Sequence, residues 1–477
     1  MADPTELDAS ALSQALAARR LSCRELMQAT LARIERLNPT YNAIVSLRDG
    51  DALLAEADGR DAQLARGDRM GWMHGLPIAI KDLVATQGIR TTLGSPLLRD
   101  FVPQEDSTMV ARIKAAGAIV IGKTNTPEFG LGSQTYNPLF GATRNAYDPT
   151  RTSGGSSGGA AVAVALHLLP VADGSDMMGS LRNPAGYNNI YALRPTWGRV
   201  PAGPAPEIYL GQLSTDGPMA RTVADLAQLL AVQAGRAPTA PLSLGDDPQV
   251  FAAPLEAGAR GLRIGWLGDL GGRLPFEDGV LDLCRRALGE FEALGHGVAE
   301  VLPAFDFDRL WDAWCTLRHW LVAGRQMELY RDERRRAQIK PEARWEIERG
   351  LALSALDIYE ASKTRSAWYQ TLRRLFETWD VLALPTAQVF PFDAATHWPA
   401  EIAGRRMDSY HRWMEVVVPG SMYGGPIMAV PAGFNAAGLP MGLQLIGRQR
   451  DELTLLRLAQ AYDDATSWPR RRPPPAI

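Results

Sequence analysis

The sequence predicts an α/β protein in which helices cover the faces of a largely parallel sheet. Two parts of the chain alternate between short apolar runs of strand length and longer stretches with helical periodicity. The predicted elements are a strand at 78–81, a helix at 108–116 and a strand at 118–122, then a strand at 262–267, a helix at 278–294 and a strand at 298–301. Strand, helix and strand in this order favour parallel crossovers. With 477 residues, 46% of them hydrophobic, the chain can bury a large core.

Residues 6–66 are predicted to be helical. Ser22, followed by Glu25, fits a capping box, in which each residue satisfies a free N–H group at the start of a helix. Apolar residues then recur at helical spacing: Met27, Leu31, Ile34 and Leu37. We interpret this region as a packing layer that carries no chemistry.

A second helical region is predicted at 305–378, where the composition becomes helix-forming and rich in tryptophan. The tryptophans are Trp311, Trp314, Trp320, Trp345 and Trp368. Large aromatic side chains most often anchor helices on a core, and we expect this role for most of them.

Charge and hydropathy argue against nucleic acid and membranes as partners. The net charge is −3 and the pI is about 6.1, so no strong field attracts polyanions. The amino terminus has no basic segment followed by an apolar one, and no run of about 20 apolar residues occurs. We expect a cytoplasmic protein that binds a small molecule, and a homodimer is compatible with the sequence.

The cysteines and histidines do not predict a metal site or a disulfide framework. The three cysteines lie far apart in the sequence, and the six histidines lack the spacing of known zinc motifs. We therefore expect no metal and no cofactor.

Two serines and one lysine suggest acyl transfer without histidine. Ser156 and Ser180 offer two hydroxyls, of which one can attack a carbonyl while the other passes on its proton. Lys81 ends the apolar run at 76–80, which is compatible with burial. A lysine serves as a base near pH 7 only if its pKa is lowered by about 3 units.

The motifs around these residues resemble the amidase signature family. The segment at 153–159 reads S-G-G-S-S-G-G, the segment at 74–81 fits H-G-x-P-x-x-x-K, and the segment at 174–182 fits G-x-D-x-x-G-S-x-R. Further matches occur at 217–222, 380–386 and 438–447, so the resemblance covers nearly the whole chain.

The resemblance implies a Ser-cis-Ser-Lys triad. Ser180 would be the nucleophile, Ser156 the bridging hydroxyl after a cis peptide bond, and Lys81 the base. The same resemblance implies one α/β domain over 1–477 around a mixed, mainly parallel sheet. Its catalytic core would lie at 70–230, and the helical insert at 305–378 would cover the substrate.

The resemblance also implies supporting roles near the nucleophile. The oxyanion hole would use backbone N–H groups of the four residues Met177, Met178, Gly179 and Ser180. Asp176, Arg182 and Ser157 would hold this loop and the triad in place. Independently of the resemblance, Met177, Met178, Tyr187 and Tyr209 are apolar or aromatic residues that lie near Ser180 in the sequence, and we expect them to contact substrate.

The methionine pair departs from the pattern common in the family, which reads G-T-D-T-G-G-S. Met178 stands where glycine is usual, and a methionine fits there without strain if its φ is negative. We expect a negative φ, with both methionine side chains narrowing the acyl site.

Two competing motifs fit less well. Residues 154–158 satisfy the G-x-S-x-G pattern of a nucleophile elbow, but such an elbow follows a strand, and residues 145–153 are polar and contain proline. A phosphate-binding loop would need a G-K-[ST] sequence after the glycines, and none occurs.

The leading functional hypothesis is an amidase that cleaves a small apolar or aryl carboxamide through an acyl-enzyme, with carbamates or esters as further substrates. One alternative is the glutamine-hydrolysing subunit of a tRNA-dependent amidotransferase, which belongs to the same family. The methionine pair and the segment at 183–189 differ from what we expect of that subfamily. A degenerate scaffold is the other alternative, and retention of all three triad residues argues against it.

Overall fold

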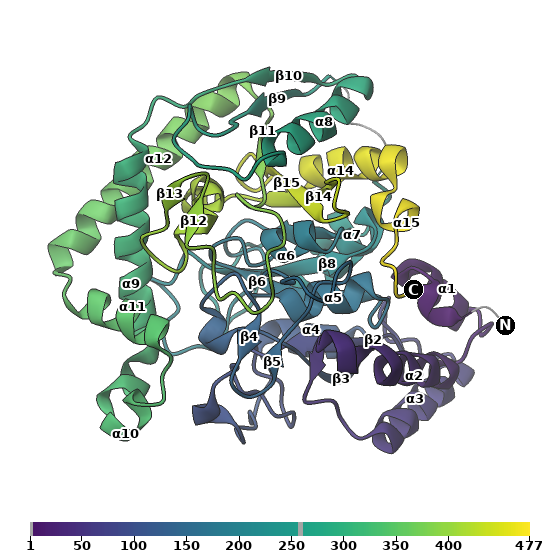
Figure 1. Ribbon diagram of the computed structural model, residues 1–477. Coiled ribbons are helices and arrows are strands. Elements are labelled where there is room, and N and C mark those ends of the chain that lie inside the picture. The colour runs from purple at the N-terminus through teal and green to yellow at the C-terminus, as the bar shows by residue number, and fades with distance from the viewer. Residues whose placement is uncertain (1–2, 256–260) are drawn as a thin grey trace.

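An eight-stranded sheet crosses the protein and carries helices on its faces (Figure 1). The structure is a computed structural model, which describes residues 3–255 and 261–477. The strand order is β10-β9-β11-β15-β14-β7-β8-β6. The bounds are β6 Val171–Asp176, β7 Tyr191–Arg194, β8 Thr215–Ala220, β9 Arg263–Trp266, β10 Gly297–Glu300, β11 Val381–Pro385, β14 Ile427–Phe434 and β15 Pro440–Gly447.

The predicted α/β domain with a mixed sheet is confirmed, but the sheet is not mainly parallel. Among the described strands of the eight-stranded sheet, two neighbouring pairs are parallel, β10 with β9 and β9 with β11. The other five pairs are antiparallel. The prediction was drawn from segments with a crossover helix, whereas β14 and β15 form a hairpin, which reverses chain direction.

A smaller sheet places the predicted base. It has the order β1-β3-β2, with β1 Ile44–Val45, β2 Pro77–Lys81 and β3 Ile119–Thr124. β2 and β3 are parallel and all their residues are buried, as the alternation of strand and helix predicts. Two short ribbons complete the strands: β4 Tyr136–Asn137 with β5 Gly141–Ala142, and β12 Glu401–Ile402 with β13 Arg405–Arg406.

The N-terminal region predicted at 6–66 is mainly helical, but its residues Ile44–Val45 form strand β1 of the small sheet. Its helices are α1 Ala9–Ala17, α2 Cys23–Tyr41 and α3 Gly50–Ala65. The capping box opens α2: the Glu25 N–H donates to Ser22 Oγ at 3.0 Å, and the Ser22 N–H donates to Glu25 Oε2 at 2.9 Å. Met27 and Ile34 of α2 are buried in the core.

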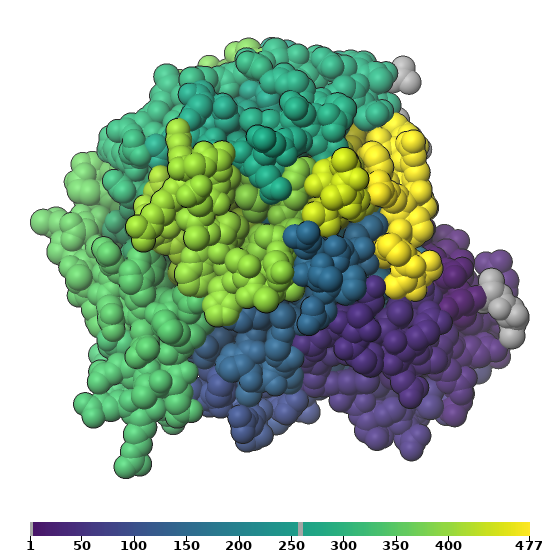
Figure 2. Space-filling model, in the orientation of Figure 1, coloured from purple at the N-terminus to yellow at the C-terminus, as the bar shows by residue number. Residues whose placement is uncertain are grey.

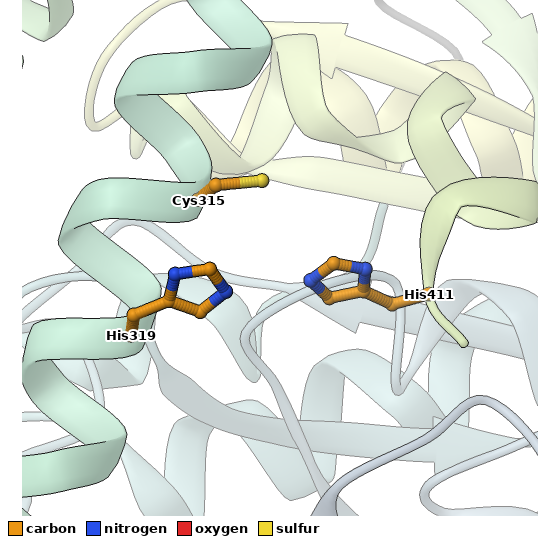
Figure 3. Close-up of side chains that lie close together, drawn as sticks. All are labelled: Cys315, His319 and His411. Atoms are coloured by element: carbon orange, nitrogen blue, oxygen red, sulfur yellow. The ribbon is translucent and has the colours of Figure 1, made fainter. Parts of the chain in front are cut away.

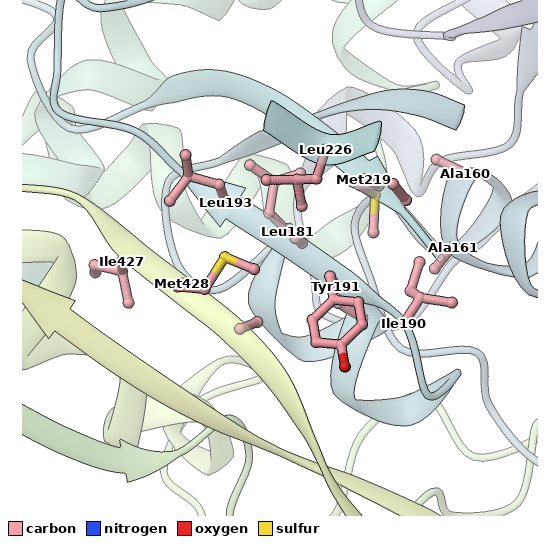
Figure 4. Packing of buried hydrophobic residues seen from close by; sticks show 14 of the residues in the cluster. Ala160, Ala161, Leu181, Ile190, Tyr191, Leu193, Met219, Leu226, Ile427 and Met428 are labelled. Carbon is pink, nitrogen blue, oxygen red and sulfur yellow. The ribbon is translucent and has the colours of Figure 1, made fainter. Parts of the chain in front are cut away.

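Further helices lie around the two sheets. Their bounds are α4 Thr108–Ala115, α5 Gly158–Ala165, α6 Arg182–Tyr187, α7 Val223–Gln233, α8 Val280–Ala293, α13 Val418–Tyr423, α14 Glu452–Thr466 and α15 Trp468–Arg471. The short 3₁₀ helices are η1 Pro4–Glu6, η2 Pro96–Leu98, η3 Glu128–Gly130, η4 Pro248–Phe251 and η5 Arg412–Val417. Figure 4 shows the resulting core, where Leu181, Tyr191 and Met428 pack between helix and sheet, all fully buried.

The region predicted at 305–378 is helical and forms one outer side of the protein (green in Figure 1). It comprises α9 Phe307–Arg331, α10 Glu333–Arg336, α11 Pro341–Leu351 and α12 Ala355–Thr378. Trp314 and Trp368 are fully buried, and the Trp368 indole N–H donates to the Pro419 carbonyl at 2.8 Å. These two tryptophans anchor the helices on the core, as predicted.

The C-terminal segment lies next to the N-terminal helices (yellow and purple in Figure 2). The Tyr147 hydroxyl donates to the Arg472 carbonyl at 2.7 Å, which ties this segment to the stretch between β5 and α5. Among the helices that the structure describes, none combines the length and the apolar character needed to cross a bilayer.

Candidate active site

Lys81 ends β2 inside the protein, with its amine among three hydroxyls. Lys81 Nζ lies 2.8 Å from Ser156 Oγ, 2.8 Å from Ser157 Oγ and 3.0 Å from Ser175 Oγ. Its backbone N–H donates to the Asp173 carboxylate on β6 at 3.1 Å, which links the two sheets at this point. Hydrogen bonds therefore hold Lys81 in place both at its backbone and at its side-chain amine.

Burial changes the acid–base chemistry of this lysine. Desolvation lowers the pKa of Lys81 to about 7, although Asp173, Asp216 and Asp176 oppose the shift. Near neutral pH a large fraction of the amine is uncharged, and an uncharged amine accepts a proton from a neighbouring hydroxyl. The Ser156 hydroxyl is in hydrogen-bond contact with it.

The segment around Ser156 packs so closely against its neighbours that its glycine positions leave no room for a side chain. The Gly155–Ser156 peptide is cis, as the family resemblance implies. A Cβ atom on Gly159 would lie 2.3 Å from the Asn125 backbone nitrogen, so only glycine allows α5 to approach the small sheet. Ser156 is only 2% exposed, and its side chain has little freedom to leave the lysine.

Ser180 lies in the loop between β6 and α6. Its carbonyl accepts a hydrogen bond from the Ser157 N–H at 3.1 Å, so the two serine-bearing segments are joined by their backbones. Ser156, Ser175 and Ser180 line one cavity of about 90 Å³. The predicted triad residues are thus brought together in one place.

A buried carboxylate shapes this loop. Asp176 forms two hydrogen bonds of 2.9 Å with the Arg182 guanidinium, and Arg194 Nε lies 3.5 Å from its Oδ1. Burial alone would raise the pKa of Asp176, but the two arginines keep it well below its ordinary value. The ionised carboxylate also accepts the Gly179 N–H at 2.9 Å and the Leu181 N–H at 3.2 Å.

Three of the four predicted oxyanion donors are free. Within 3–255 and 261–477, the N–H groups of Met177, Met178 and Ser180 meet no acceptor. The Gly179 N–H does not match the prediction, since it is engaged by Asp176. Met178 does not have a positive φ, as expected, and the positive φ of 79° falls on Gly179.

The cavity wall comes from several distant parts of the chain. Apolar side chains supply much of it: Leu83, Phe129, Leu131, Met177, Met178 and Val322. α9 also contributes Arg318, Arg325 and Gln326, so one helix of the 305–378 region forms part of the wall. Both methionines face the cavity, as predicted from the sequence.

Tyr187 and Tyr209, which the sequence suggested as substrate contacts, lie elsewhere. Tyr187 is fully buried in α6 and donates its hydroxyl to the Val389 carbonyl at 2.6 Å. Tyr209 is 59% exposed on a loop. Neither residue lines the cavity, because closeness in sequence to Ser180 does not carry these side chains towards it.

Sequence reasoning missed four residues at the site. Ser175 and Asp173 alternate on β6, and two residues apart on a strand they face the same side, where both touch Lys81. The two-residue alternation of side chains along a strand could have identified Asp173 and Ser175 from the sequence. Arg318 and His411, by contrast, belong to distant segments that only the folded chain brings to the cavity.

Two arginines of α9 differ in their partners. Arg318 is paired with Glu346 at 2.6 Å and with the Tyr410 hydroxyl at 2.7 Å, and its Nη1 lies 3.7 Å from Met177 Sδ. The Arg325 side chain makes no hydrogen bond or ion pair within the part of the chain that the structure describes. Its guanidinium is thus available to a bound molecule.

Comparison with known proteins agrees with the motifs and the geometry. A sequence profile of the amidase family matches residues 25–456. The chain belongs to the amidase signature family. A glutamyl-tRNA(Gln) amidotransferase subunit from Chloroflexus aurantiacus is 36% identical, and the alignment covers 99% of each chain.

Solved structures of this family share the fold. A bacterial aryl acylamidase superposes with a TM-score of 0.90 at 29% identity, over 98% of this chain and 99% of the other. The corresponding glutamyl-tRNA(Gln) amidotransferase subunit from Thermotoga maritima superposes with a TM-score of 0.77 at 28% identity, over 97% and 96%. The chain is therefore an amidase signature enzyme with the complete fold of these relatives.

Proposed function

We propose that this enzyme cleaves the C–N bond of a small carboxamide through an acyl-enzyme on Ser180. The observation that carries the proposal is the 2.8 Å contact between Lys81 Nζ and Ser156 Oγ, with Ser180 on the same cavity. A lysine with a pKa of about 7 can act as the base, and a second hydroxyl can relay the proton.

The reaction proceeds in two steps, acylation of Ser180 and hydrolysis of the acyl-enzyme. As Ser180 Oγ bonds to the carbonyl carbon, its proton passes to Ser156 Oγ, while the Ser156 proton passes to Lys81. When the tetrahedral intermediate collapses, the C–N bond breaks, and a proton returns along the same path to the leaving amine. Water then attacks the ester by the same relay and releases the carboxylic acid and Ser180.

The free N–H groups of the loop would stabilise the oxyanion. Met177, Met178 and Ser180 offer donors that no protein acceptor occupies among the described residues. The loss of one such donor typically costs about 2.7–4 kcal/mol of transition-state stabilisation. The Asp176–Arg182 pair keeps the loop in this conformation before substrate arrives.

Two substrate classes are candidates. A small apolar or aryl amide suits the apolar part of the wall, where Met177 and Met178 narrow the space, and the high TM-score with an aryl acylamidase supports this class. Carbamates and esters with the same acyl group would extend it.

Glutamine is the other candidate, with the chain acting as one component of a tRNA-dependent amidotransferase. Curated relatives of that name at 34–37% identity support it, and at the level of sequence they support it better than the aryl amide. Arg325 adds a physical reason, because an unpaired guanidinium in the cavity wall suits the carboxylate of an amino acid.

A direct comparison of substrates distinguishes the two. The purified chain is incubated with an anilide, a matched phenyl carbamate and glutamine, and release of aniline or ammonia is measured beside Ser180→Ala. Turnover of the anilide by the chain alone favours the aryl amide. Ammonia release from glutamine, stimulated by partner subunits and tRNA, favours the amidotransferase, and no Ser180-dependent turnover of any of them would contradict both.

A further inference from the structure

A cluster of nitrogen and sulfur atoms lies beside the cavity and takes no part in the proposed reaction. The residues are Cys315, His319 and His411, whose possible ligand atoms all lie within 4.8 Å of one another. Figure 3 shows the two imidazoles pointing towards each other, with the thiol next to them. Their ring centroids are 6.4 Å apart and the ring planes differ by 11°.

Two secondary-structure elements bring these side chains together. Cys315 and His319 are four residues apart on α9, so they lie on the same face of the helix one turn from each other. His411 comes from the segment directly before η5, on the opposite side of the gap. Because two of the three residues lie on one rigid helix, mainly side-chain rotation would bring the three ligand atoms closer together.

The cluster contains buried polar atoms whose bonding capacity is not used. His319 Nε2 and His411 Nε2 have no hydrogen-bond partner within residues 3–255 and 261–477, and the two residues are only 7% and 3% exposed. Buried polar atoms are nearly always bonded, so atoms left without a partner call for a ligand. Glu346 Oε2 is also unpartnered in the described chain and lies 3.7 Å from His319 Nε2.

We propose that Cys315, His319 and His411 bind a divalent transition metal of the zinc type. Thiolate and imidazole are the ligands that Zn²⁺ prefers, and tetrahedral bonds of about 2.0–2.3 Å place ligand atoms about 3.3–3.8 Å apart. The possible ligand atoms already lie within 4.8 Å of one another, so side-chain rotation can bring them to these separations. The inference is independent of the proposed reaction at Ser180.

The surroundings fit a bound cation. Ser409 Oγ lies 2.7 Å from His411 Nδ1, and a Nδ1–H donated to it leaves the Nε2 lone pair free for the metal. Glu346 supplies a nearby negative charge, which Arg318 balances at 2.6 Å, and Arg349 and Arg412 add positive charge near the two histidines.

The position of the cluster gives the metal an open side. Three protein ligands leave a fourth coordination position, which is the arrangement of sites that also bind water or substrate. His411 lines the catalytic cavity, and Arg318, next to His319, contacts Met177. A metal here would therefore change the shape and charge of the acyl side of the cavity.

Co²⁺ serves as the probe, because a Co²⁺–thiolate bond gives an absorption band that imidazole ligands alone do not give. The untagged full chain is stripped with a chelator and titrated with Co²⁺, and bound metal is counted after desalting. The proposal predicts one Co²⁺ for each chain, the thiolate band, and displacement of Co²⁺ by Zn²⁺. Absence of saturable binding by the wild type would overturn it, and the cluster would then hold water.

Substitutions test the ligands one at a time. Cys315→Ala should remove the thiolate band, and His411→Asn should weaken binding more than the roughly 10–100-fold that loss of an outer-sphere partner costs. Cys284→Ala, which removes another buried thiol outside the cluster, is the matched control. Equal binding in all three variants would also overturn the proposal, and the wild-type spectrum decides the question even if a variant does not fold.

Discussion

At the scale of single residues, the proposed reaction depends on one amine. Lys81 is buried at the end of β2, and its Nζ meets three hydroxyls and no carboxylate within hydrogen-bond distance among the described residues. Water would favour the charged amine, whereas burial favours the neutral one, and burial prevails here. A surface lysine in the same motif would remain protonated and could not accept a proton.

The pH dependence of the reaction follows from this amine. The neutral form is the base, and protonation increases as pH falls through about 7, so kcat/KM should fall about tenfold for each pH unit below that value. The test is a pH–rate profile on an uncharged amide between pH 5 and 9. A flat profile across this range would contradict the assignment of Lys81 as base.

Met178 gives a second prediction at this scale. Its φ is not positive, so Met178→Gly removes side-chain volume from the cavity wall and leaves the backbone N–H in reach. We expect hydrolysis to be retained and the ratio of kcat/KM between a long and a short acyl amide to rise. An equal change on both amides would instead indicate that the loop acts through the oxyanion.

At the scale of elements, the turn from β6 into α6 depends on a buried ion pair. Asp176 has fully buried partners in Arg182 and Arg194, and it also accepts backbone N–H groups of the turn. Removal of this charge leaves two buried guanidinium groups without their counter-ion. The expected cost is large, because buried unpaired charges are far more destabilising than exposed ones.

Asp176→Asn should lower the free energy of unfolding by about 3–5 kcal/mol. Denaturant unfolding followed by fluorescence measures it. The matched control is Asp58→Asn, since Asp58 pairs with Arg24 at 2.5 Å on the surface, and such pairs contribute about 0–1 kcal/mol. Similar losses for the two variants would show that the buried pair does not hold the turn.

The contribution of α9 to substrate binding can be tested with a substitution and a matched control. If Arg325 receives a carboxylate, Arg325→Gln should raise KM about 10–100-fold for an amide with a carboxylate and leave an uncharged amide nearly unchanged. Arg331→Gln at the end of the same helix is the control. A loss that is equal for both amides would show that Arg325 does not select charge.

At the scale of the whole molecule, sequence motifs identified the residues of the proposed catalytic centre, which the fold brings together, better than they described the surroundings of that centre. Lys81, Ser156 and Ser180 could be predicted because each lies in a short motif, and a short motif can be recognised from the order of neighbouring residues alone. The antiparallel pairs of the sheet could not, since pairing depends on contacts between distant segments. The same limit explains why Tyr187 was placed in the cavity and why Arg318, from a distant helix, was missed.

The cavity depends on that long-range assembly. The triad comes from the small sheet and from the segments around α5 and β6, whereas the facing wall belongs to α9. Figure 1 shows α9 on the outer side of the molecule, away from the N-terminal helices. Substitutions in α9 can therefore change which substrates fit the cavity, without moving Ser156 and Ser180.

The central claim is that the acyl group is carried by Ser180. It is tested most directly by quenching the enzyme with acid during turnover of a slowly hydrolysed amide or ester and mapping the acylated peptide by mass spectrometry. The account predicts the acyl mass on Ser180 in the wild type, and no label and no turnover in Ser180→Ala. An acyl group found on Ser156, or full activity of Ser180→Ala, would contradict it.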